Sequence, residues 1–230
     1  MSAPSAVLFD LDGTLVDSRP GIVAALNQTL SAMGEPELPE ADLVCRIGPP
    51  IHDTWSELLR RPVDAVDDVV LAYRERYTAT MLGGSHVYPG VERLLELLAA
   101  EGHLMAVATS KAQPMAVALL EHLGLDGFFA AIRGPVPPST EEKPATVGRT
   151  LEALGLATGA GAVLVGDRHH DVAGGHAHGL AVIGAAWGYG TLEELGAAGA
   201  EAIAAEPAGV APLLHGLERK SGGATRARAR

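Results

Sequence analysis

The 230-residue sequence has few of the residues that mark several protein classes. Its one cysteine, Cys45, excludes an internal disulfide and fits a reducing compartment. Aromatic residues make up only 4%, so the core must be built from Ala, Leu and Val, which favours helices packed on a parallel sheet. No apolar run reaches 18 residues, and no basic segment precedes the first apolar run. We therefore expect a cytoplasmic protein with no membrane partner.

Positive charge is also scarce, with 17 basic against 28 acidic residues and a net charge of −11. Five of the basic residues lie within residues 219–230, so the first 218 residues hold 12 basic and 28 acidic residues and carry −16. Because such a body repels phosphate backbones, we expect no nucleic-acid partner. We expect residues 219–230 to form a disordered tail, whose role the sequence leaves open.

The order of the apolar segments predicts an α/β fold with a helical insert. The run Ala6–Phe9 is typical of a buried parallel strand, and a helix begins near Asp17 and ends at Gly34. Helical patterns continue to residue 82, and Gly83-Gly84-Ser85 interrupts them. Further strands are predicted over 104–108, 130–133, 162–165, 181–185 and 202–203, and helices from 91 to the stop at Gly102 and over 114–123, 144–154, 171–178, 192–198 and 209–217.

This alternation predicts a Rossmann-like open parallel sheet with helices on both faces. We expect residues 1–16 and 86–218 to form this α/β core and residues 17–85 to form an all-helical cap subdomain.

Polar residues follow the predicted strands, where ligands bind in open α/β sheets. They are Asp10, Asp12, Thr109, Ser110, Lys111, Lys143, Asp167 and Asp171. Carboxylates that converge on one sheet edge repel each other unless a cation neutralises them, which predicts a hard divalent ion, in practice Mg²⁺. In Asp10-Leu11-Asp12, both carboxylates lie on one side of an extended segment, so one can attack or bind metal while the other moves a proton.

These segments together resemble the haloacid dehalogenase superfamily, in particular its phosphoglycolate-phosphatase-like branch with a helical (C1-type) cap. Residues 10–18, DLDGTLVDS, resemble the first motif, and residues 107–111, VATSK, the second. Lys143-Pro144 resembles the third motif, and Val165-Gly166-Asp167 with Asp171 resembles the fourth. The segments IGPP at 47–50 and WGYG at 187–190 also look like this branch. The resemblance covers about residues 5–215, with the motifs in the family's order.

The resemblance implies a role for each matching residue. Asp10 would be the nucleophile that forms an aspartyl-phosphate, and Asp12 would be the general acid and base. Thr109, Lys143 and the backbone N–H groups of Leu11 and Ser110 would hold the phosphoryl oxygens. Magnesium would be held by Asp10, the Asp12 carbonyl and Asp167, with support from Asp171.

The acid at position 12 favours a phosphatase or phosphomutase over dehalogenases or ion pumps. We therefore expect a magnesium-dependent hydrolase of a small phosphorylated metabolite similar to phosphoglycolate. A 5′-nucleotidase or a sugar or biosynthetic-intermediate phosphatase is the alternative within the superfamily. A phosphomutase and a non-catalytic phosphate-binding module are the alternatives from other classes. The sequence gives neither the leaving group nor the oligomeric state.

Two arginines outside the four motifs are further candidates for substrate contact. Arg46 stands beside the IGPP segment of the cap, and Arg168 directly follows Asp167. A histidine cluster lies in the same region and could bind zinc, contact substrate or only support packing. Its members are His169, His170, His176 and His178, and their role stays open.

Overall fold

The main sheet of this computed structural model has six parallel strands in the order β5-β4-β1-β6-β7-β8. The structure describes residues 6–138, 141–156 and 161–217, so the predicted tail 219–230 lies outside it. The strands are β1 (Ala6–Phe9), β4 (Leu104–Ala108), β5 (Ala131–Arg133), β6 (Ala162–Gly166), β7 (Ala181–Ala185) and β8 (Ala202–Ala204). Leu8 of the central strand lies opposite Ala106 on one side and Leu164 on the other. The predicted open parallel sheet is confirmed.

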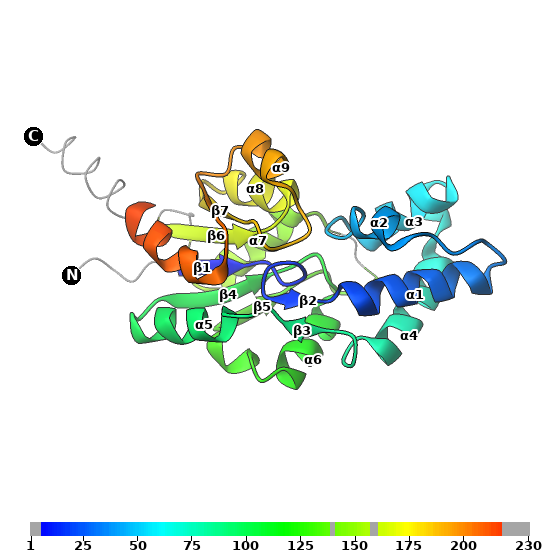
Figure 1. Ribbon diagram of the computed structural model, residues 1–230, viewed down its shortest axis with the longest axis horizontal. Coiled ribbons are helices and arrows are strands. Elements are labelled where there is room, and N and C mark those ends of the chain that lie inside the picture. Colours follow the sequence, from blue (N-terminus) through cyan, green and yellow to red (C-terminus); the bar gives the residue numbers. More distant parts are fainter. Residues whose placement is uncertain (1–5, 139–140, 157–160, 218–230) are drawn as a thin grey trace, which may run out of the picture.

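Helices cover both faces of this sheet, as the non-alternating apolar strands predict (Figure 1). Val7 and Phe9 pack on one face and Ala6 and Leu8 on the other. The first face is covered by α5 (Val91–Ala100), α6 (Gln113–His122) and the helical residues 210–217. The second is covered by α7 (Lys143–Ala153), α8 (His169–His176) and α9 (Leu192–Ala198), while η2 (Asp126–Phe128) and η3 (Pro207–Gly209) are short 3₁₀ turns.

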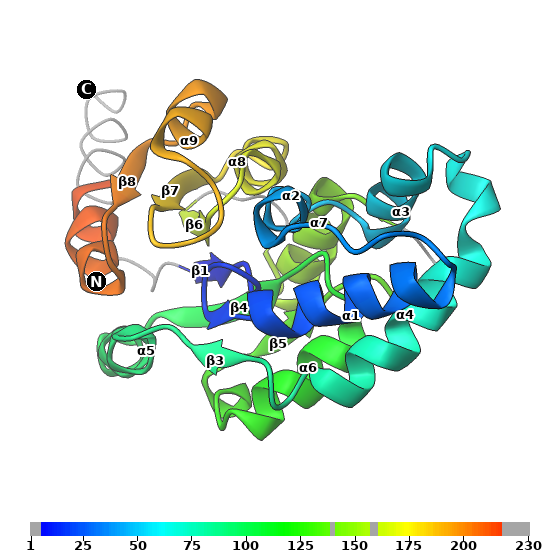
Figure 2. The same ribbon diagram turned by 45° about the vertical axis from the view of Figure 1, so that its right-hand side comes forward.

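Four helices from the insert lie together beyond one end of the sheet (Figures 1 and 2). They are α1 (Arg19–Ala32), α2 (Glu40–Val44), α3 (Ile51–Leu59) and α4 (Asp67–Thr80), with the 3₁₀ turn η1 (Val63–Ala65) before α4. Their core contains Trp55 edge-on to Tyr73, and Tyr73 stacked on Tyr77. We call this helical group the cap.

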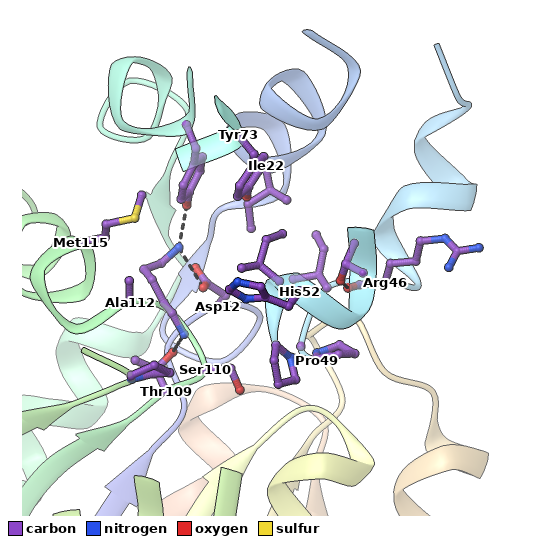
Figure 3. Close-up of a pocket in the computed structure, with 18 of the residues that line it drawn as sticks. Asp12, Ile22, Arg46, Pro49, His52, Tyr73, Thr109, Ser110, Ala112 and Met115 are labelled. Carbon is purple, nitrogen blue, oxygen red and sulfur yellow. Dashed lines mark hydrogen bonds and ion pairs between the residues drawn. The ribbon is translucent and has the colours of Figure 1, made fainter. Parts of the chain in front are cut away.

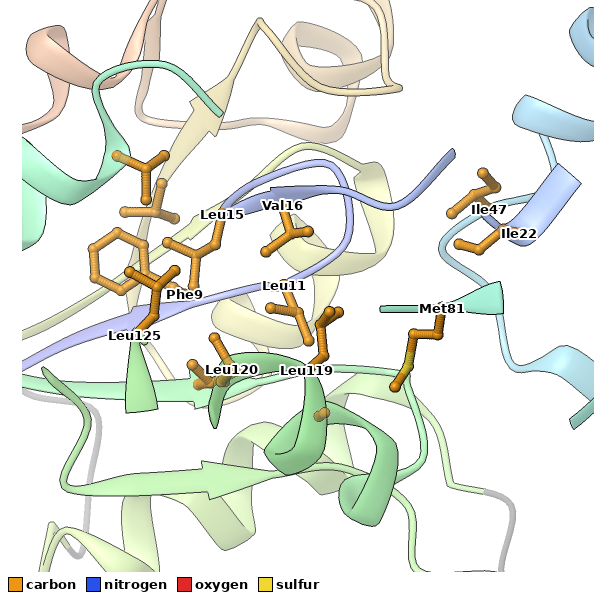
Figure 4. Close-up of a cluster of buried hydrophobic side chains, with 14 of the residues drawn as sticks. Phe9, Leu11, Leu15, Val16, Ile22, Ile47, Met81, Leu119, Leu120 and Leu125 are labelled. Carbon is orange, nitrogen blue, oxygen red and sulfur yellow. The ribbon is translucent and has the colours of Figure 1, made fainter. Parts of the chain in front are cut away.

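The apolar interior runs without a break from the sheet into the cap. Phe9 and Leu119 belong to the same buried cluster as Ile22 and Ile47 of the cap (Figure 4). The division into a core (1–16 and 86–218) and a cap (17–85) as separate units therefore remains a prediction.

A small antiparallel ribbon lies where the chain passes from the sheet into the cap and back. Strand β2 (Val16–Asp17) pairs with β3 (His86–Val87), and Val16 lies opposite Val87. The sequence analysis did not predict this ribbon, because two residues are too few to show an alternating pattern. Both predicted boundaries of the cap fall on it.

Several predicted element ends shift by one or two residues. The helix predicted from residue 171 begins at His169, because the Asp171 carboxylate accepts the backbone N–H of Arg168 at 3.0 Å from inside the first turn. The helix predicted from residue 144 begins at Lys143 with Pro144 in its first turn, where a proline is well tolerated.

Candidate active site

Asp10 directly follows the carboxyl end of β1, and its side chain contacts a buried lysine. The Lys143 ammonium lies 2.5 Å from Asp10 Oδ1 and 2.6 Å from Asp171 Oδ1. Burial of Lys143 opposes its charge, but the two carboxylates outweigh burial and raise the pKa of Lys143 above its ordinary value. Asp10, Asp171 and Lys143 are predicted site residues from three different motifs, and the fold brings them together.

Three buried carboxylates, from Asp10, Asp167 and Asp171, place one oxygen each within 4.8 Å of the others. Burial raises the pKa of Asp10 to about 7; the charges of Asp171 and Asp12 add to this effect and that of Lys143 opposes it. Burial, together with the charges of Asp171 and Asp10, raises the pKa of Asp167 as well. Mutually repelling carboxylate oxygens at one sheet edge form a donor set that fits a small hard cation such as Mg²⁺.

The Asp167 side chain is held from two loops. It accepts hydrogen bonds from the Thr14 hydroxyl at 3.3 Å and from the backbone N–H of Tyr189 at 2.7 Å. A Cβ at Gly13, where φ is +92°, or at Gly188 would lie 2.3 Å from an atom of the Asp167 side chain. Glycine at these positions therefore lets the DLDGT and WGYG segments close around Asp167.

Asp12 is held by two side chains from other elements. Its Oδ1 accepts a hydrogen bond from the Ser18 hydroxyl, and its Oδ2 lies 2.9 Å from the Lys111 ammonium. Lys111 is buried, and its Nζ also lies 2.7 Å from the hydroxyl of Tyr77 in the cap. Burial again opposes the charge of Lys111, and Asp12 and Tyr77 raise its pKa.

Two of the predicted phosphate-binding residues, Thr109 and Ser110, line the same cavity as Asp10. Thr109 is buried, and its hydroxyl accepts the backbone N–H of Lys111 at 3.1 Å. Neither the N–H of Leu11 nor that of Ser110 donates to another described residue, so both amides remain available to an oxyanion.

A cavity of about 100 Å³ lies between these residues and the cap (Figure 3). From the core it is lined by Asp10, Asp12, Thr109, Ser110, Lys111, Ala112, Met115, Pro135 and Glu141. From the cap it is lined by Ile22, Leu26, Tyr73, Arg74, Tyr77 and most of the segment 46–54. The site therefore places two neighbouring carboxylates, those of Asp10 and Asp12, at the wall of a covered space.

A sequence model of the haloacid dehalogenase-like hydrolases matches residues 7–185. The chain belongs to this family. The match contains every residue that the resemblance assigned a role, and the predicted family is confirmed.

Relatives with curated names carry several activities. The chain is 37% identical to the tyrosine-protein kinase PtkA of Mycobacterium tuberculosis over 83% of this chain and 65% of the kinase, which is less than two thirds of that relative's length. It is 36% identical to a 5′-nucleotidase of Pseudomonas aeruginosa, covering 82% and 86% of the two chains. It is 37% identical to a phosphoglycolate phosphatase of Rhodospirillum rubrum, covering 87% and 86%.

A solved haloacid dehalogenase-like hydrolase from Streptococcus pneumoniae has a similar fold, with a TM-score of 0.84 and 28% identity over 93% of this chain and 99% of that one. As for membranes, no helix among the described residues is long and apolar enough to cross one.

The two predicted arginines are engaged with protein groups. Arg46 lines the cavity, but its guanidinium pairs with Glu57 and points away from Asp12 (Figure 3). Arg168 is buried under the cap, where its guanidinium donates to the carbonyls of Ile47 and Cys45 and pairs with Glu194 at 2.8 Å. Arg168 thus fastens the cap segment to the core, and substrate binding by either arginine remains a prediction.

The four histidines have separate partners. His169 bonds Glu194, and His176 lies 3.1 Å from Glu201. His178 Nε2 lies 2.8 Å from the carbonyl oxygen of Pro144, and the ring of His170 lies against that of His169. These contacts support packing around α8, since among the described residues the four do not converge on a common point.

Lys111 is a residue that the sequence places at this edge of the sheet without predicting its partners. The VATSK segment placed it beside Thr109 and Ser110, but its partner Tyr77 lies 34 residues away on α4. Its place after a buried strand predicts that Lys111 lies at the sheet edge, but no local pattern pairs it with Tyr77.

Proposed function

We propose that this hydrolase is a magnesium-dependent phosphatase that cleaves a small organic phosphomonoester through an aspartyl-phosphate on Asp10. The observation that carries this proposal is the position of Asp10 at the floor of the covered cavity, with Lys143 on one oxygen and Asp167 and Asp171 beside it. Asp10, Asp167 and the Asp12 carbonyl would hold magnesium, with support from Asp171. Bound there, the ion would neutralise phosphoryl charge.

In the first step, a carboxylate oxygen of Asp10 forms a bond to phosphorus, and the bond from phosphorus to the leaving oxygen breaks. Asp12 gives a proton to that oxygen, so the product leaves as an alcohol. The Lys143 ammonium, the Thr109 hydroxyl and the amides of Leu11 and Ser110 hold the three remaining phosphoryl oxygens.

In the second step, a water oxygen forms a bond to phosphorus, and the bond from phosphorus to Asp10 breaks. Asp12 accepts the water proton, and the electron pair of the broken bond returns to the Asp10 carboxylate. Inorganic phosphate is the product. The cap covers the cavity during both steps and limits the water that reaches the phosphoryl group.

The small cavity supports a small leaving group. A phosphoglycolate-like ester fits the relative from Rhodospirillum rubrum, and a nucleotide or a sugar or biosynthetic phosphate is the alternative, supported by the nucleotidase relative. A panel of phosphorylated metabolites, scored by phosphate release, separates these substrates. An isomeric phosphate ester as product would instead identify a phosphomutase.

A second candidate is phosphoryl transfer to protein tyrosine, which the identity to the PtkA kinases favours. It predicts phosphotyrosine formation from ATP, whereas the proposed hydrolysis predicts free phosphate from a monoester. Incubating the protein with both substrates and measuring both products decides between the two.

The central test is turnover of p-nitrophenyl phosphate with Mg²⁺, with EDTA, and in Asp10→Asn. We expect EDTA and the substitution each to lower turnover by at least about 10³-fold, because metal and nucleophile act in the same step. The control Asp126→Asn makes the same change at an exposed position and should retain full activity. Metal-independent turnover, or an active Asp10→Asn variant, contradicts the proposal.

A further inference from the structure

Lys111 is a buried cation at the contact between the core and the cap. Its side chain is 4% exposed, with Nζ 2.9 Å from Asp12 Oδ2, 2.7 Å from the Tyr77 hydroxyl and 4.4 Å from the centre of the Tyr77 ring. A buried ammonium is costly unless it is paired, so these partners fix its position.

Both oxygens of the Asp12 carboxylate are occupied in this arrangement. The Ser18 hydroxyl donates to Oδ1, and Ser18 is fully buried directly before α1. Lys111 holds Oδ2 and is itself held by Tyr77 on α4. The orientation of Asp12 therefore depends on the residue that leads into the cap, Ser18, and, through Lys111, on Tyr77 within the cap.

This arrangement fixes the orientation of the Asp12 carboxylate. A carboxylate that must take a proton from water has to be ionised and turned toward that water, and misorientation by a fraction of an ångström is costly. An ammonium 2.9 Å from Oδ2 restricts rotation of the carboxylate. In the proposed function, the step in which Asp12 takes a proton from water is hydrolysis of the aspartyl-phosphate.

We propose that Lys111 is a positioning residue that orients Asp12 as the base of the second step once Tyr77 of the cap is in contact. The inference rests on the proposed function, and it names the residue that controls the second step, hydrolysis of the aspartyl-phosphate. In that half, the water proton passes to the oriented Asp12 carboxylate, while the new oxygen–phosphorus bond replaces the bond to Asp10.

The substrate p-nitrophenyl phosphate separates the two steps, because p-nitrophenolate leaves without needing a proton from Asp12. In Lys111→Met we expect phosphorylation of Asp10 to be spared and its hydrolysis to be slowed by about 10²-fold, the low end of general-base effects. Stopped flow should then show a larger burst of nitrophenolate than in the wild type. Mass spectrometry after acid quenching should find more protein with a phosphoryl group on Asp10.

A milder variant and two references complete the design. Tyr77→Phe removes only the hydroxyl that holds Lys111, and we expect the same burst with a slowdown of roughly 3- to 10-fold. Asp12→Asn should show a larger slowdown than either variant. Thr78→Val changes the next residue of α4, whose hydroxyl bonds the Arg74 carbonyl at 2.7 Å, and should match the wild type.

Slowed turnover of Lys111→Met without accumulation of phosphorylated Asp10 overturns the inference, and so does a Tyr77→Phe variant that matches Thr78→Val. If Lys111→Met loses cooperative unfolding, Tyr77→Phe alone decides. If the wild type does not hydrolyse the aryl phosphate with Mg²⁺, the proposed function fails and the inference fails with it. If the wild type is active and both variants match it, only the inference fails.

Discussion

Asp167 shows at the scale of single residues how tightly this site is built. Its carboxylate lies between two backbone segments, and a Cβ at Gly188 would stand 2.3 Å from Asp167 Cβ and 2.4 Å from the Gly13 carbonyl oxygen. These contacts are with backbone and with the start of a side chain, which have little freedom to move away. The absence of a side chain at Gly188 is thus a requirement of the carboxylate cluster.

We predict that Gly188→Ala lowers the free energy of unfolding by about 1–3 kcal/mol, the usual cost of forcing an extra methyl group into a packed region. It should also lower magnesium-dependent turnover by more than about 10-fold, because Asp167 is displaced. Urea unfolding and turnover of p-nitrophenyl phosphate measure the two effects. The control Gly196→Ala lies within α9 with open space around it, and there alanine should raise stability slightly. Equal behaviour of both variants contradicts the argument.

Glu194 gives a pH-dependent prediction. Burial alone would raise its pKa, but hydrogen bonds from Arg168 and from the backbone and ring of His169 outweigh burial and lower the pKa of Glu194 to about 2. The folded state therefore favours the ionised form. The stabilisation is complete above the ordinary pKa near 4.5 and is lost as the pH falls from there toward 2.

We expect Glu194→Gln to lower the free energy of unfolding by about 1 kcal/mol at pH 7, since the site is partly exposed to screening solvent. This deficit should shrink as the pH is lowered from 5 toward about 2–3. Urea unfolding at pH 7 and pH 3 checks the change. Glu193→Gln alters an exposed neighbour and should give no deficit at either pH. A deficit that is constant with pH would show that charge is not its source.

How well the site could be predicted depends on where each partner lies in the chain. Asp10, Asp12 and Asp167 stand directly after apolar strands, so local pattern and topology together place them at one sheet edge. The contacts of Arg168 and Lys111 join residues 121 and 34 positions apart, respectively. Such pairings depend on how the cap lies on the core, which no local pattern encodes.

At the scale of elements, the start of α1 and the segment after α4 cross at two glycines. The Gly21 N–H donates to the Gly84 carbonyl at 3.3 Å, and a Cβ at Gly84 would stand 2.8 Å from Gly21 Cα. In the sequence, Gly83-Gly84-Ser85 stands out as a break between helical patterns, but the break does not predict this close approach. The partner segment lies more than 60 residues earlier, so the break alone could not show it.

We predict that Gly84→Ala weakens the attachment of the cap, because its methyl group meets the backbone of Gly21. The free energy of unfolding should fall by about 1–3 kcal/mol, and proteolysis near residues 80–85 should become faster. Gly83→Ala is the matched control, since a Cβ there meets nothing within 4 Å. Denaturant unfolding and timed proteolysis of both variants give the measurement. If Gly83→Ala is cut as fast as Gly84→Ala, chain stiffness and not the crossing explains the effect.

At the scale of the whole molecule, negative charge and the site have to be considered together. The chain carries −11, and three of its acids are buried within 4.8 Å of one another at one sheet edge. Lys143 brings one positive charge to these three carboxylates, and burial with the charge of Asp171 raises the pKa of Asp10 in spite of it. In the absence of a cation the carboxylate cluster therefore opposes folding, and a bound cation should stabilise the entire structure.

We predict that Mg²⁺ raises the melting temperature of the wild type by several degrees. At about 100 times the dissociation constant, binding to the folded state contributes about 2.7 kcal/mol. For a chain of this size, that free energy corresponds to roughly 5–10 °C.

Asp167→Asn should lose most of this shift, because a ligand is gone. Without metal it should melt no lower than the wild type, because one repelling charge is gone too. Asp126→Asn should keep the full shift. Thermal scans with Mg²⁺ and with EDTA test all three proteins, and an equal shift in Asp167→Asn would place the ion elsewhere.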